Sequence, residues 1–467
     1  MRKTKIICTL GPASDSPEKI RALIQAGTDV FRLNMSHAEH EWVRRTVSYI
    51  REISLDMDRP VGILLDTQGP AIRTGDIKTK LNLKPGNILE FTVLGARSQE
   101  EYSVDVNYDG LIHDISVGDV VLVDNGVIHL KVLSKLDNKI RCEVLTEGVL
   151  GSRRHINLPG VKVSLPPLTE KDLYDIELGV SVGVDFVALS FCREASDIEQ
   201  LRSVLHQHGS SAKIIAKIED QHAVKNLDAI IKISDAIMIA RGDLGIECPM
   251  EELPIIQRRI IKHCIRFGKP VIVATHMLES MISNPLPTRA EITDVANAVF
   301  EQSDAIMLSG ESAMGKYPVE SVQILDRVAR RIETSGGADY AVDALIEDER
   351  HKMVNSGVVL ANSFENSKII AFTRAGNIAG YASHLRPKNA PIFAFSPSAE
   401  VMHQMTLLRA VHPAQMPFSI DPQHTVADAE KYLKEHGMIQ HGDPLIIMSD
   451  ILAGEERFDS IHLRRAF

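Results

Sequence analysis

Short apolar runs recur along the chain, each followed by a polar or glycine-rich turn and then a stretch with helical spacing. Eight such runs are rich in β-branched residues: 5–10, 29–34, 61–66, 185–190, 213–219, 235–240, 270–275 and 304–309. Near-continuous apolar runs are typical of parallel strands that are buried on both faces. Eight strand–helix repeats predict a TIM (β/α)8 barrel, with an open doubly wound sheet as the alternative.

Helix-start signals lie in the stretches between these runs. The segment 16–27 starts with a Ser-Pro pair and ends at a glycine, which is the usual asymmetry of helix ends. Two other segments start with pairs that are spaced like capping boxes, Thr169 with Asp172 and Thr288 with Glu291. These signals predict helices that alternate with the apolar runs.

The repeat is interrupted once, between the third and fourth apolar runs. Residues 70–164 alternate apolar and polar positions and carry an Asp-Asn-Gly turn signal at 124–126. We predict a β-barrel lid domain here, inserted on the face of the TIM barrel where active sites lie. An inert insertion is the alternative. The barrel itself would comprise residues 1–69 and 165–338.

The last part of the chain has a pattern of its own. Three strand-like runs at 368–373, 391–396 and 445–450 alternate with helical segments. Strands that alternate with helices favour an α/β unit with a parallel sheet. We therefore predict a separate C-terminal α/β domain, with a regulatory role, over residues 339–467.

The composition of the chain argues against several classes of protein. The chain has 467 residues, of which 44% are hydrophobic and 24% charged, as in ordinary globular proteins. Its formal net charge of −10 argues against nucleic-acid binding, and no stretch approaches the length of a membrane span. The five scattered cysteines form no CxxC pair, which argues against a disulfide framework or a zinc site and favours the cytoplasm.

Charged and hydroxyl side chains gather at the ends of the eight runs. Active sites of TIM barrels lie at the carboxyl ends of the strands, so we expect these side chains to line one site. They are Arg32, Asn34, Ser36, Asp66, Thr67, Ser190, Lys217, Glu219, Asp243, Thr275, Ser309 and Glu311.

The residue types favour a phosphorylated acid as substrate, together with a metal. Lys217 and Glu219 are two apart on one strand and so face the same side of it. Glu219 and Asp243 supply hard oxygen ligands suited to Mg²⁺ or Mn²⁺, and Lys217 supplies a positive charge for a phosphoryl group in transfer. Gly242 would let the backbone approach an anionic carboxylate closely. A buried Lys–Glu ion pair is the alternative.

Two further groups of side chains suit ions. Arg32 and Arg73 offer guanidinium groups that match the geometry of phosphate. Four short side chains could surround a monovalent cation with oxygen atoms: Asn34, Ser36, Asp66 and Thr67. Local capping and turn hydrogen bonds explain the same four residues equally well.

The motifs, in their order along the chain, resemble the pyruvate kinase family. The matching segments are KIICTLGPAS at 5–14, FRLNMSHA at 31–38, LLDTQGPAIRTG at 64–75, AKIED at 216–220, ARGDLGIE at 240–247, GKPVIVATHMLESM at 268–281, PTRAEITDVANAV at 287–299 and IMLSGESAMGKYPVE at 306–320. The resemblance implies transfer of the phosphoryl group of phosphoenolpyruvate to ADP, giving pyruvate and ATP in the last step of glycolysis. It also implies Mg²⁺ or Mn²⁺, K⁺, and an allosteric homotetramer.

The resemblance implies roles for individual residues. The catalytic residues would be Lys217, Arg73, Thr275, Ser309 and Glu311. Phosphoenolpyruvate would be bound by Arg32, Lys217, Ser190, Gly242, Asp243 and Thr275. ADP or ATP would be bound by Arg73, Arg154, Asn34 and His37. The divalent ion would be held by Glu219 and Asp243, and K⁺ by Asn34, Ser36, Asp66 and Thr67.

Some positions depart from the family pattern. Ala71 stands where the family has Glu or Lys, which are associated with K⁺ dependence and independence respectively, so the K⁺ requirement stays open. Ala375 and Ile378 replace the hydroxyl residues of the family's sugar-phosphate loop, and the tail 454–467 lacks its glycine-rich loop. We expect that fructose 1,6-bisphosphate is not the activator.

Two other functions fit parts of the pattern. A carbon–carbon lyase that uses phosphoenolpyruvate or an oxoacid could share the metal site of such a barrel, but it would not need an inserted lid. A non-catalytic metabolite sensor is the alternative from a different class, and the intact set of rim residues argues against it.

Overall fold

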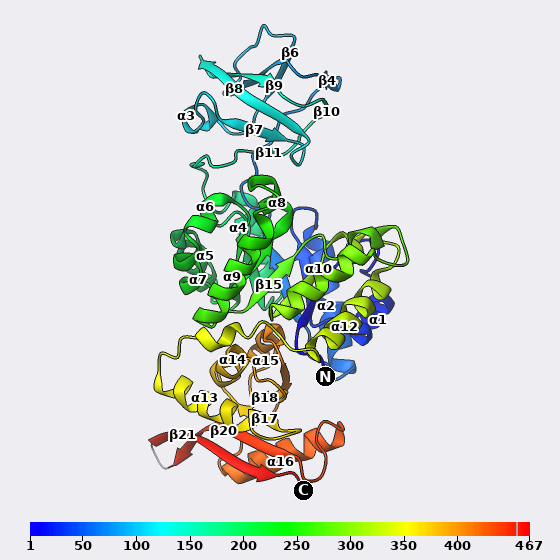
Figure 1. The fold of residues 1–467 in the computed structure, drawn as a ribbon, viewed down its shortest axis with the longest axis vertical. Helices are drawn as coiled ribbons and strands as arrows, with labels where there is room; N and C mark the ends of the chain where they lie inside the picture. Colours follow the sequence, from blue (N-terminus) through cyan, green and yellow to red (C-terminus); the bar gives the residue numbers. More distant parts are fainter. Residues whose placement is uncertain (454–455) are drawn as a thin grey trace.

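The computed structural model describes residues 1–453 and 456–467, which form three bodies stacked along one axis (Figure 1). The middle body is a closed barrel of eight parallel strands in the order β1-β16-β15-β14-β13-β12-β3-β2, so the predicted TIM barrel is confirmed. Its strands are β1 (Lys5–Thr9), β2 (Val30–Asn34), β3 (Gly62–Asp66), β12 (Phe186–Leu189), β13 (Lys213–Ile218), β14 (Ala236–Ala240), β15 (Val271–Ala274) and β16 (Ala305–Leu308).

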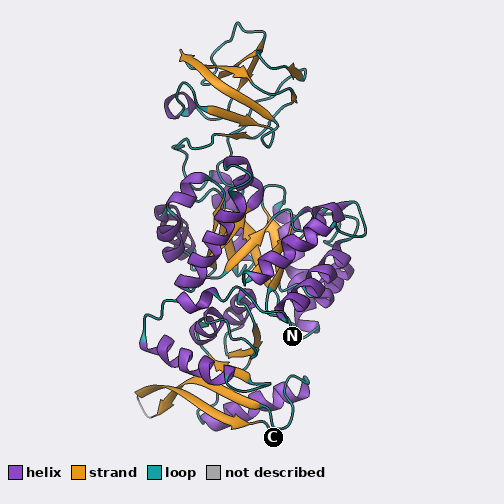
Figure 2. Ribbon diagram, in the orientation of Figure 1, coloured by secondary structure: helices purple, strands orange, loops and turns teal. Residues whose placement is uncertain are grey.

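Helices cover the outside of the barrel (Figure 2). The main ones are α1 (Pro17–Ala26), α2 (His40–Asp56), α4 (Glu170–Ser181), α5 (Ala195–Gln207), α7 (Leu227–Ile233), α9 (Leu253–Phe267), α10 (Arg289–Phe300) and α12 (Pro318–Glu333). Thr169 and Thr288 both form the predicted capping boxes, with Asp172 and Glu291. Each box satisfies backbone N–H groups that the first helical turn leaves free.

The interior of the barrel explains where the rim residues point. Alternate residues of each strand face inward, and the inner cluster includes Ile215 of β13 but not its neighbours Ile214 and Ala216. Lys217 lies two residues after Ile215 and therefore belongs to the inward-facing set. The alternation along β13 thus turns the Lys217 side chain into the barrel. Its place next to the last residue of the strand puts the ammonium group at the carboxyl end of the barrel.

The lid is the upper body in Figure 1. It contains a six-stranded sheet in the order β11-β7-β8-β9-β5-β6, a two-stranded sheet β10-β4 and one short helix, α3 (Leu111–Asp114). The sheet ends in two edge strands, β11 and β6, and is therefore not a closed ring. The strands are β4 (Leu81–Leu83), β5 (Ile88–Thr92), β6 (Tyr102–Asp105), β7 (Val120–Val123), β8 (Ile128–Leu136), β9 (Lys139–Val144), β10 (Gly148–Leu150) and β11 (Ile156–Asn157).

The C-terminal body has a five-stranded sheet in the order β19-β18-β17-β20-β21, with only β21 antiparallel to its neighbour. Its strands are β17 (Lys368–Phe372), β18 (Ile392–Ser396), β19 (Val411–Gln415), β20 (Pro444–Ala453) and β21 (Glu456–Arg465). The helices are α13 (Glu349–Asn362), α14 (Asn377–His384), α15 (Ala399–Gln404) and α16 (Pro422–Glu435). The three predicted strands correspond to β17, β18 and β20. Gly454 and Glu455, which begin the tail discussed above, lie outside the described residues.

The barrel and the C-terminal body meet through buried polar groups. Arg386 donates to both oxygens of Asp304, at 3.0 and 2.6 Å, and both side chains are almost fully buried. The Lys5 ammonium donates to the carbonyl oxygen of Val411 at 2.5 Å. Leu407 joins the apolar cluster inside the barrel. These contacts fix the C-terminal body against the end of the barrel opposite the lid.

Among residues 1–453 and 456–467, no helix has both the length and the apolar character needed to cross a membrane. The five cysteine thiols are unpaired and buried.

Candidate active site

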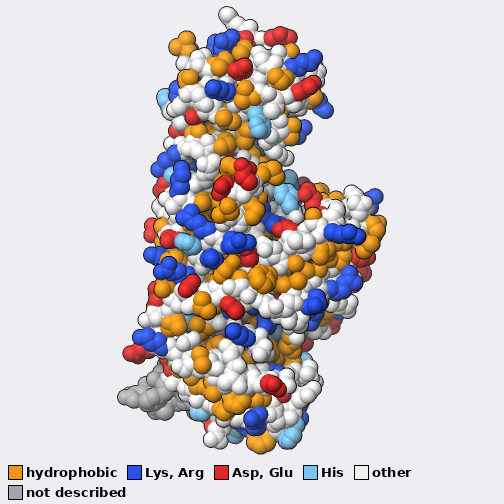
Figure 3. Space-filling view, in the orientation of Figure 1, with side chains coloured by type: hydrophobic (Ala, Val, Ile, Leu, Met, Phe, Trp, Pro, Cys, Tyr) orange, Lys and Arg blue, Asp and Glu red, His pale blue; other side chains and the backbone are white. Residues whose placement is uncertain are grey.

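A cleft of about 340 Å³ lies between the carboxyl end of the barrel and the lid. The visible face of the molecule is indented between these two bodies (Figure 3). The cleft is lined by Arg32, Asn34, Ser36, Thr67, Gln68, Ala71, Arg73, Asp124, Asn125, Arg153, Arg154, His155, Ser190, Phe191, Lys217, Glu219 and Asp243. Most of the candidate residues from the sequence therefore come together here.

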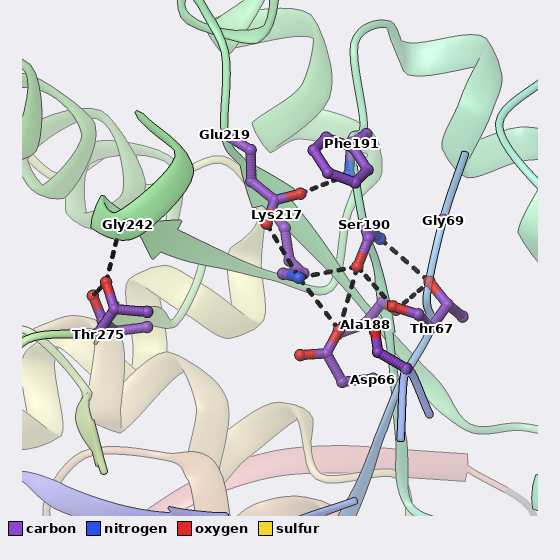
Figure 4. A network of polar contacts seen from close by, with 12 residues as sticks. Asp66, Thr67, Gly69, Ala188, Ser190, Phe191, Lys217, Glu219, Gly242 and Thr275 are labelled. Carbon is purple, nitrogen blue, oxygen red and sulfur yellow. Dashed lines mark hydrogen bonds and ion pairs between the residues drawn. The ribbon is translucent and has the colours of Figure 1, made fainter. Parts of the chain in front are cut away.

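Lys217 lies at the centre of the polar network on the cleft floor (Figure 4). Its Nζ is 3.0 Å from Glu219 Oε1 and 3.3 Å from Asp66 Oδ1, and it donates to Ser190 Oγ at 2.8 Å. Burial alone would lower the pKa of this ammonium group, but the charges of Asp66 and Glu219 outweigh burial and raise the pKa above its usual value. Lys217 is therefore held in its charged form.

Asp66 connects Lys217 to Arg32. The Arg32 guanidinium donates to Asp66 Oδ2 at 2.6 Å and to Thr9 Oγ1 at 3.0 Å. Burial would raise the pKa of Asp66, but Lys217 and Arg32 hold it below the usual value. Asp66 thus holds the charged groups of both Arg32 and Lys217 in place at the cleft. The third nitrogen of the guanidinium, Nη2, makes no hydrogen bond within the described residues.

Glu219 and Asp243 form the acidic part of the cleft. Glu219 Oε2 accepts the backbone N–H of Phe191 at 2.6 Å. Burial raises the pKa of Glu219 to about 7, and the negative charge of Asp243 adds to this rise while Lys217 opposes it. Mg²⁺ commonly binds one or two carboxylates and takes its other ligands from water and substrate phosphate. This pair of carboxylates fits that requirement, although no group of three or more His, Cys, Asp or Glu residues within the described ranges could hold a metal ion.

The four candidates for a monovalent cation are involved in local hydrogen bonds. Asn34 Oδ1 accepts the backbone N–H of Ser36 at 3.2 Å, and Thr67 Oγ1 donates to the Ala188 carbonyl at 3.0 Å. Asp66 is paired with Arg32 and Lys217, as described above. Asn34, Ser36 and Thr67 nevertheless line the cleft, so their oxygen atoms lie on its wall.

Thr275 lies on the part of the rim formed by β15 and the helix after β14 (Figure 4). Its Oγ1 accepts the backbone N–H of Gly242 at 2.8 Å and donates to the Ala274 carbonyl at 2.6 Å. Gly242 belongs to α8 (Arg241–Glu247), which follows β14 directly. Thr275 has a φ of 68°, which is uncommon for a β-branched residue and often marks a functional position.

Six predicted site residues are not part of the cleft lining. Asp66, Gly242 and Thr275 are three of them, and their contacts are described above. The other three are Glu311, Ser309 and His37. Both oxygens of buried Glu311 accept backbone N–H groups, from Ser309 at 2.8 Å and Leu278 at 3.1 Å. This arrangement joins the loops after β15 and β16. The Ser309 hydroxyl is buried and makes no hydrogen bond to the described residues. His37 is exposed, and its backbone N–H donates to the Asn34 carbonyl at 3.2 Å.

The structure adds residues to the site that the sequence did not single out. Asp124 Oδ1 lies 3.3 Å from Arg154 Nη1, and both line the cleft from the lid. Asp172 Oδ1 accepts the backbone N–H groups of Gln68 and Gly69, which fixes the turn after β3. Asp172 was visible in the sequence only as a capping residue, and Asp124 only as part of a turn signal.

Comparisons with known proteins agree with this geometry. A family model described as "Pyruvate kinase, barrel domain" matches residues 1–322, and one described as "Pyruvate kinase, alpha/beta domain" matches residues 351–462. The chain belongs to the pyruvate kinase family. Its activity is therefore the transfer of the phosphoryl group of phosphoenolpyruvate to ADP, and the lyase and sensor interpretations are set aside.

Individual pyruvate kinases are similar over nearly the whole chain. Plastidial pyruvate kinase 3 of Arabidopsis thaliana is 41% identical over 99% of this chain and 81% of its own length. A pyruvate kinase of Sporosarcina psychrophila is 42% identical over 97% of this chain and 79% of its own length. The crystal structure of a pyruvate kinase from Cryptosporidium parvum superposes with a TM-score of 0.94 at 36% identity, covering 100% of this chain and 96% of the other.

Proposed function

We propose that the cleft between barrel and lid is the place where this pyruvate kinase transfers the phosphoryl group, and that Lys217 carries the main charge for that step. The observation that carries the proposal is the Lys217 ammonium group, kept charged between Asp66 and Glu219 on the cleft floor. Transfer of a phosphoryl group depends mainly on positioning and on neutralising the charge of its oxygens. A buried, fixed ammonium group meets both needs.

The arginines on either side would position the phosphate. Arg32 is fixed by Asp66 and keeps Nη2 available for a phosphate oxygen. Arg73 belongs to the lid, where its Nη1 donates to the Arg153 carbonyl at 3.2 Å and its backbone N–H donates to Asn107 Oδ1 at 2.7 Å. Arg154 lines the same cleft from the lid and would approach ADP. Phosphoenolpyruvate would therefore be bound by the barrel and ADP largely by the lid, with Asn34 and His37 as further candidates for nucleotide contacts.

Glu219 and Asp243 would hold the divalent ion. When bound, Mg²⁺ or Mn²⁺ supplies positive charge to the phosphate and carboxylate oxygens of the substrate. Glu219 also contacts Lys217, so the residues that hold the ion and the residue that binds the phosphoryl group are fixed to one another. K⁺ would be held by the oxygens of Asn34, Ser36, Asp66 and Thr67, and the presence of Ala71 makes the K⁺ requirement a matter for measurement.

We expect Glu219→Gln to raise the Mg²⁺ concentration needed for half-maximal rate by about 10- to 100-fold, because the amide keeps the shape of the side chain but loses its charge. Titration with Mg²⁺, together with Mn²⁺ binding measured by electron paramagnetic resonance, checks this. Glu301→Gln is the matched control, since Glu301 is also buried but accepts from Gln257 Nε2 at 3.1 Å and Arg258 Nε at 2.9 Å and does not line the cleft. Unchanged Mn²⁺ affinity in Glu219→Gln contradicts the assignment.

The second half of the reaction gives a proton to the carbon of the enolate. Thr275 would lie beside that carbon, on the side of the site formed by Gly242, and Ser309 and Glu311 would extend the proton relay behind it. Loss of a positioned proton donor typically slows such a step by about 10²- to 10⁴-fold. The lid would exclude water and so limit hydrolysis of the substrate.

We expect Thr275→Val to slow pyruvate formation by about 10²-fold and Thr275→Ser to remain close to wild type, because only serine keeps the hydroxyl that accepts from Gly242. Exchange of the pyruvate methyl protons with D₂O, followed by NMR, isolates the proton-transfer step. Equal exchange rates in the valine and serine variants would exclude a role for the hydroxyl.

Domain limits, assembly and location are also proposals. Apolar clusters that fall almost entirely within one range each support three domains: the barrel at 1–69 with 165–338, the lid at 70–164 and the C-terminal domain at 339–467.

A homotetramer with allosteric control is supported by family membership and is tested by sedimentation velocity. The five unpaired thiols support a reducing compartment such as the cytoplasm.

The direct test of the activity is pyruvate formation by the purified chain from phosphoenolpyruvate, ADP and Mg²⁺, with and without K⁺. We expect pyruvate only when both ADP and the divalent ion are present. Absence of pyruvate under every salt condition would overturn the proposal, and the K⁺ arm answers the question raised by Ala71.

A further inference from the structure

A second cavity, of about 800 Å³, lies far from the lid, where the barrel meets the C-terminal body. The N-terminus, the end of α12 and residues of the C-terminal body form its walls, and Figure 1 shows the N-terminus beside this junction. Cavities of this size are typical of small-molecule sites. Four residues of its lining carry the argument: Lys3, Gln302, Lys388 and Arg409.

Arg409 is a buried cation without a partner. It is only 4% exposed, its Nε is buried without an acceptor, and none of its side-chain nitrogens makes a hydrogen bond or ion pair with residues 1–453 or 456–467. Two acidic groups, Glu333 and Asp304, act on Arg409 through their charge and raise its pKa, but both already accept hydrogen bonds from other groups. Both oxygens of Asp304 accept from Arg386, and those of Glu333 accept the backbone N–H groups of Lys3 and Thr4.

A buried guanidinium in this state is costly unless an anion pairs with it. Burial, followed by the charge of Arg386, lowers the pKa of Arg409 to about 10, so the group is still charged at neutral pH. Lys3 lies close enough for its own pKa to be lowered by burial and by Arg409. The two cations repel each other, and a shared anion would stabilise both.

Gln302, on the same cavity, presents a buried hydrogen-bond acceptor that lacks a donor. Its Oε1 is buried and accepts no hydrogen bond from the described residues. The residue also has a φ of 63°, which a non-glycine residue adopts at some cost and which tertiary contacts must maintain. A buried amide oxygen requires a donor such as a hydroxyl group.

We propose that this cavity binds a small metabolite carrying an oxyanion group and a hydroxyl group. The oxyanion, a phosphate monoester or a carboxylate, pairs with Arg409 and Lys3, and the hydroxyl donates to Gln302 Oε1. Lys388 lies at the same opening and adds positive charge. Since the ligand contacts both the barrel and the C-terminal body, it stabilises their junction.

The test measures ligand binding to the full chain, and it is independent of turnover. Glycerol 3-phosphate and glycerate serve as probes, inorganic phosphate lacks the hydroxyl, and glycerol lacks the charge. We expect one of the two hydroxylated anions to bind by isothermal titration calorimetry and to bind at least tenfold more weakly to Arg409→Met. The matched control is Arg331→Met, since Arg331 is an exposed arginine on α12 that does not line the cavity. Any binding in the active-site cleft is common to all three proteins.

The variants separate the two halves of the proposal. Gln302→Met is expected to bind inorganic phosphate as well as wild type does but to lose the preference for the hydroxylated probe, and an unchanged preference overturns the hydroxyl contact. Equal affinity of wild type and Arg409→Met, or no binding of any anion, overturns the site and leaves a cavity that holds only water. If Arg409→Met does not fold, Lys388→Met gives the same comparison from the cavity opening.

Discussion

Replacing Lys217 with methionine is expected to lower kcat for pyruvate formation by about 10³-fold or more. Methionine keeps much of the length of lysine but removes the ammonium group that Asp66, Ser190 and Glu219 hold on the cleft floor. That charge acts on the phosphoryl group in the transition state more than on the bound substrate, so kcat should fall further than KM rises. Steady-state kinetics with phosphoenolpyruvate and ADP measure the difference.

The control for this variant lies on the same strand. Lys213→Met removes a lysine from the opposite end of β13 and should leave kcat within about twofold of wild type, because a remote surface charge is screened by solvent. Arg32 still pairs with Asp66 in Lys217→Met, so we expect the variant to fold, and circular dichroism checks this. Near-normal turnover by a folded Lys217→Met protein would remove Lys217 from the mechanism.

Replacing Arg386 with methionine is expected to lower the free energy of unfolding by about 3–5 kcal/mol. Arg386 and Asp304 are 4% and 1% exposed at the junction between barrel and C-terminal body, and they share two hydrogen bonds. The substitution leaves the Asp304 carboxylate buried without its cation. Urea denaturation followed by circular dichroism, analysed for each transition, measures the loss.

Two comparisons show whether the loss comes from an unpaired buried charge. The double variant Arg386→Met/Asp304→Asn should recover most of the stability, because the amide is neutral and its oxygen still accepts the backbone N–H of Val271. Arg330→Met breaks a partly exposed pair with Asp326, whose carboxylate keeps Arg2 as a second cation, and should cost only about 0–1 kcal/mol. A double variant as unstable as Arg386→Met would mean that lost packing, and not charge, is responsible.

The barrel was predictable because its strands are buried on both faces. Such strands appear in the sequence as apolar runs, and all eight runs coincide with barrel strands to within one or two residues. The C-terminal sheet was only partly predictable for the same reason. Its central strands β17, β18 and β20 are apolar runs, whereas β19 contains Pro413 and mixes buried with exposed positions. Proline lacks the N–H that a central strand needs, and β19 lies at the edge of the sheet.

The site was predictable where a side chain lies at the carboxyl end of a strand. Lys217 and Asp66 are examples, because closure of the barrel brings strand ends together whatever their separation in sequence. Contacts made by backbone atoms were not predictable. The backbone N–H of Phe191 donates to Glu219, but every residue except proline has such a group, so the residue type does not indicate this contact. Glu311 was expected in a proton relay, but its two bonds to backbone N–H groups depend on loop positions that the sequence does not reveal.

The order of the strands also has a consequence for synthesis of the chain on the ribosome. Strand β1 pairs with β16, so the ring of strands cannot close before residues near 308 have left the exit tunnel. The lid has its own apolar core, formed between Ile72 and Leu158, and can fold much earlier. Domains generally fold as units during translation, and pairing of distant segments is slow. The nascent chain should therefore carry a finished lid on an open, incomplete barrel for about a third of its elongation, and this is the period in which it most needs chaperones.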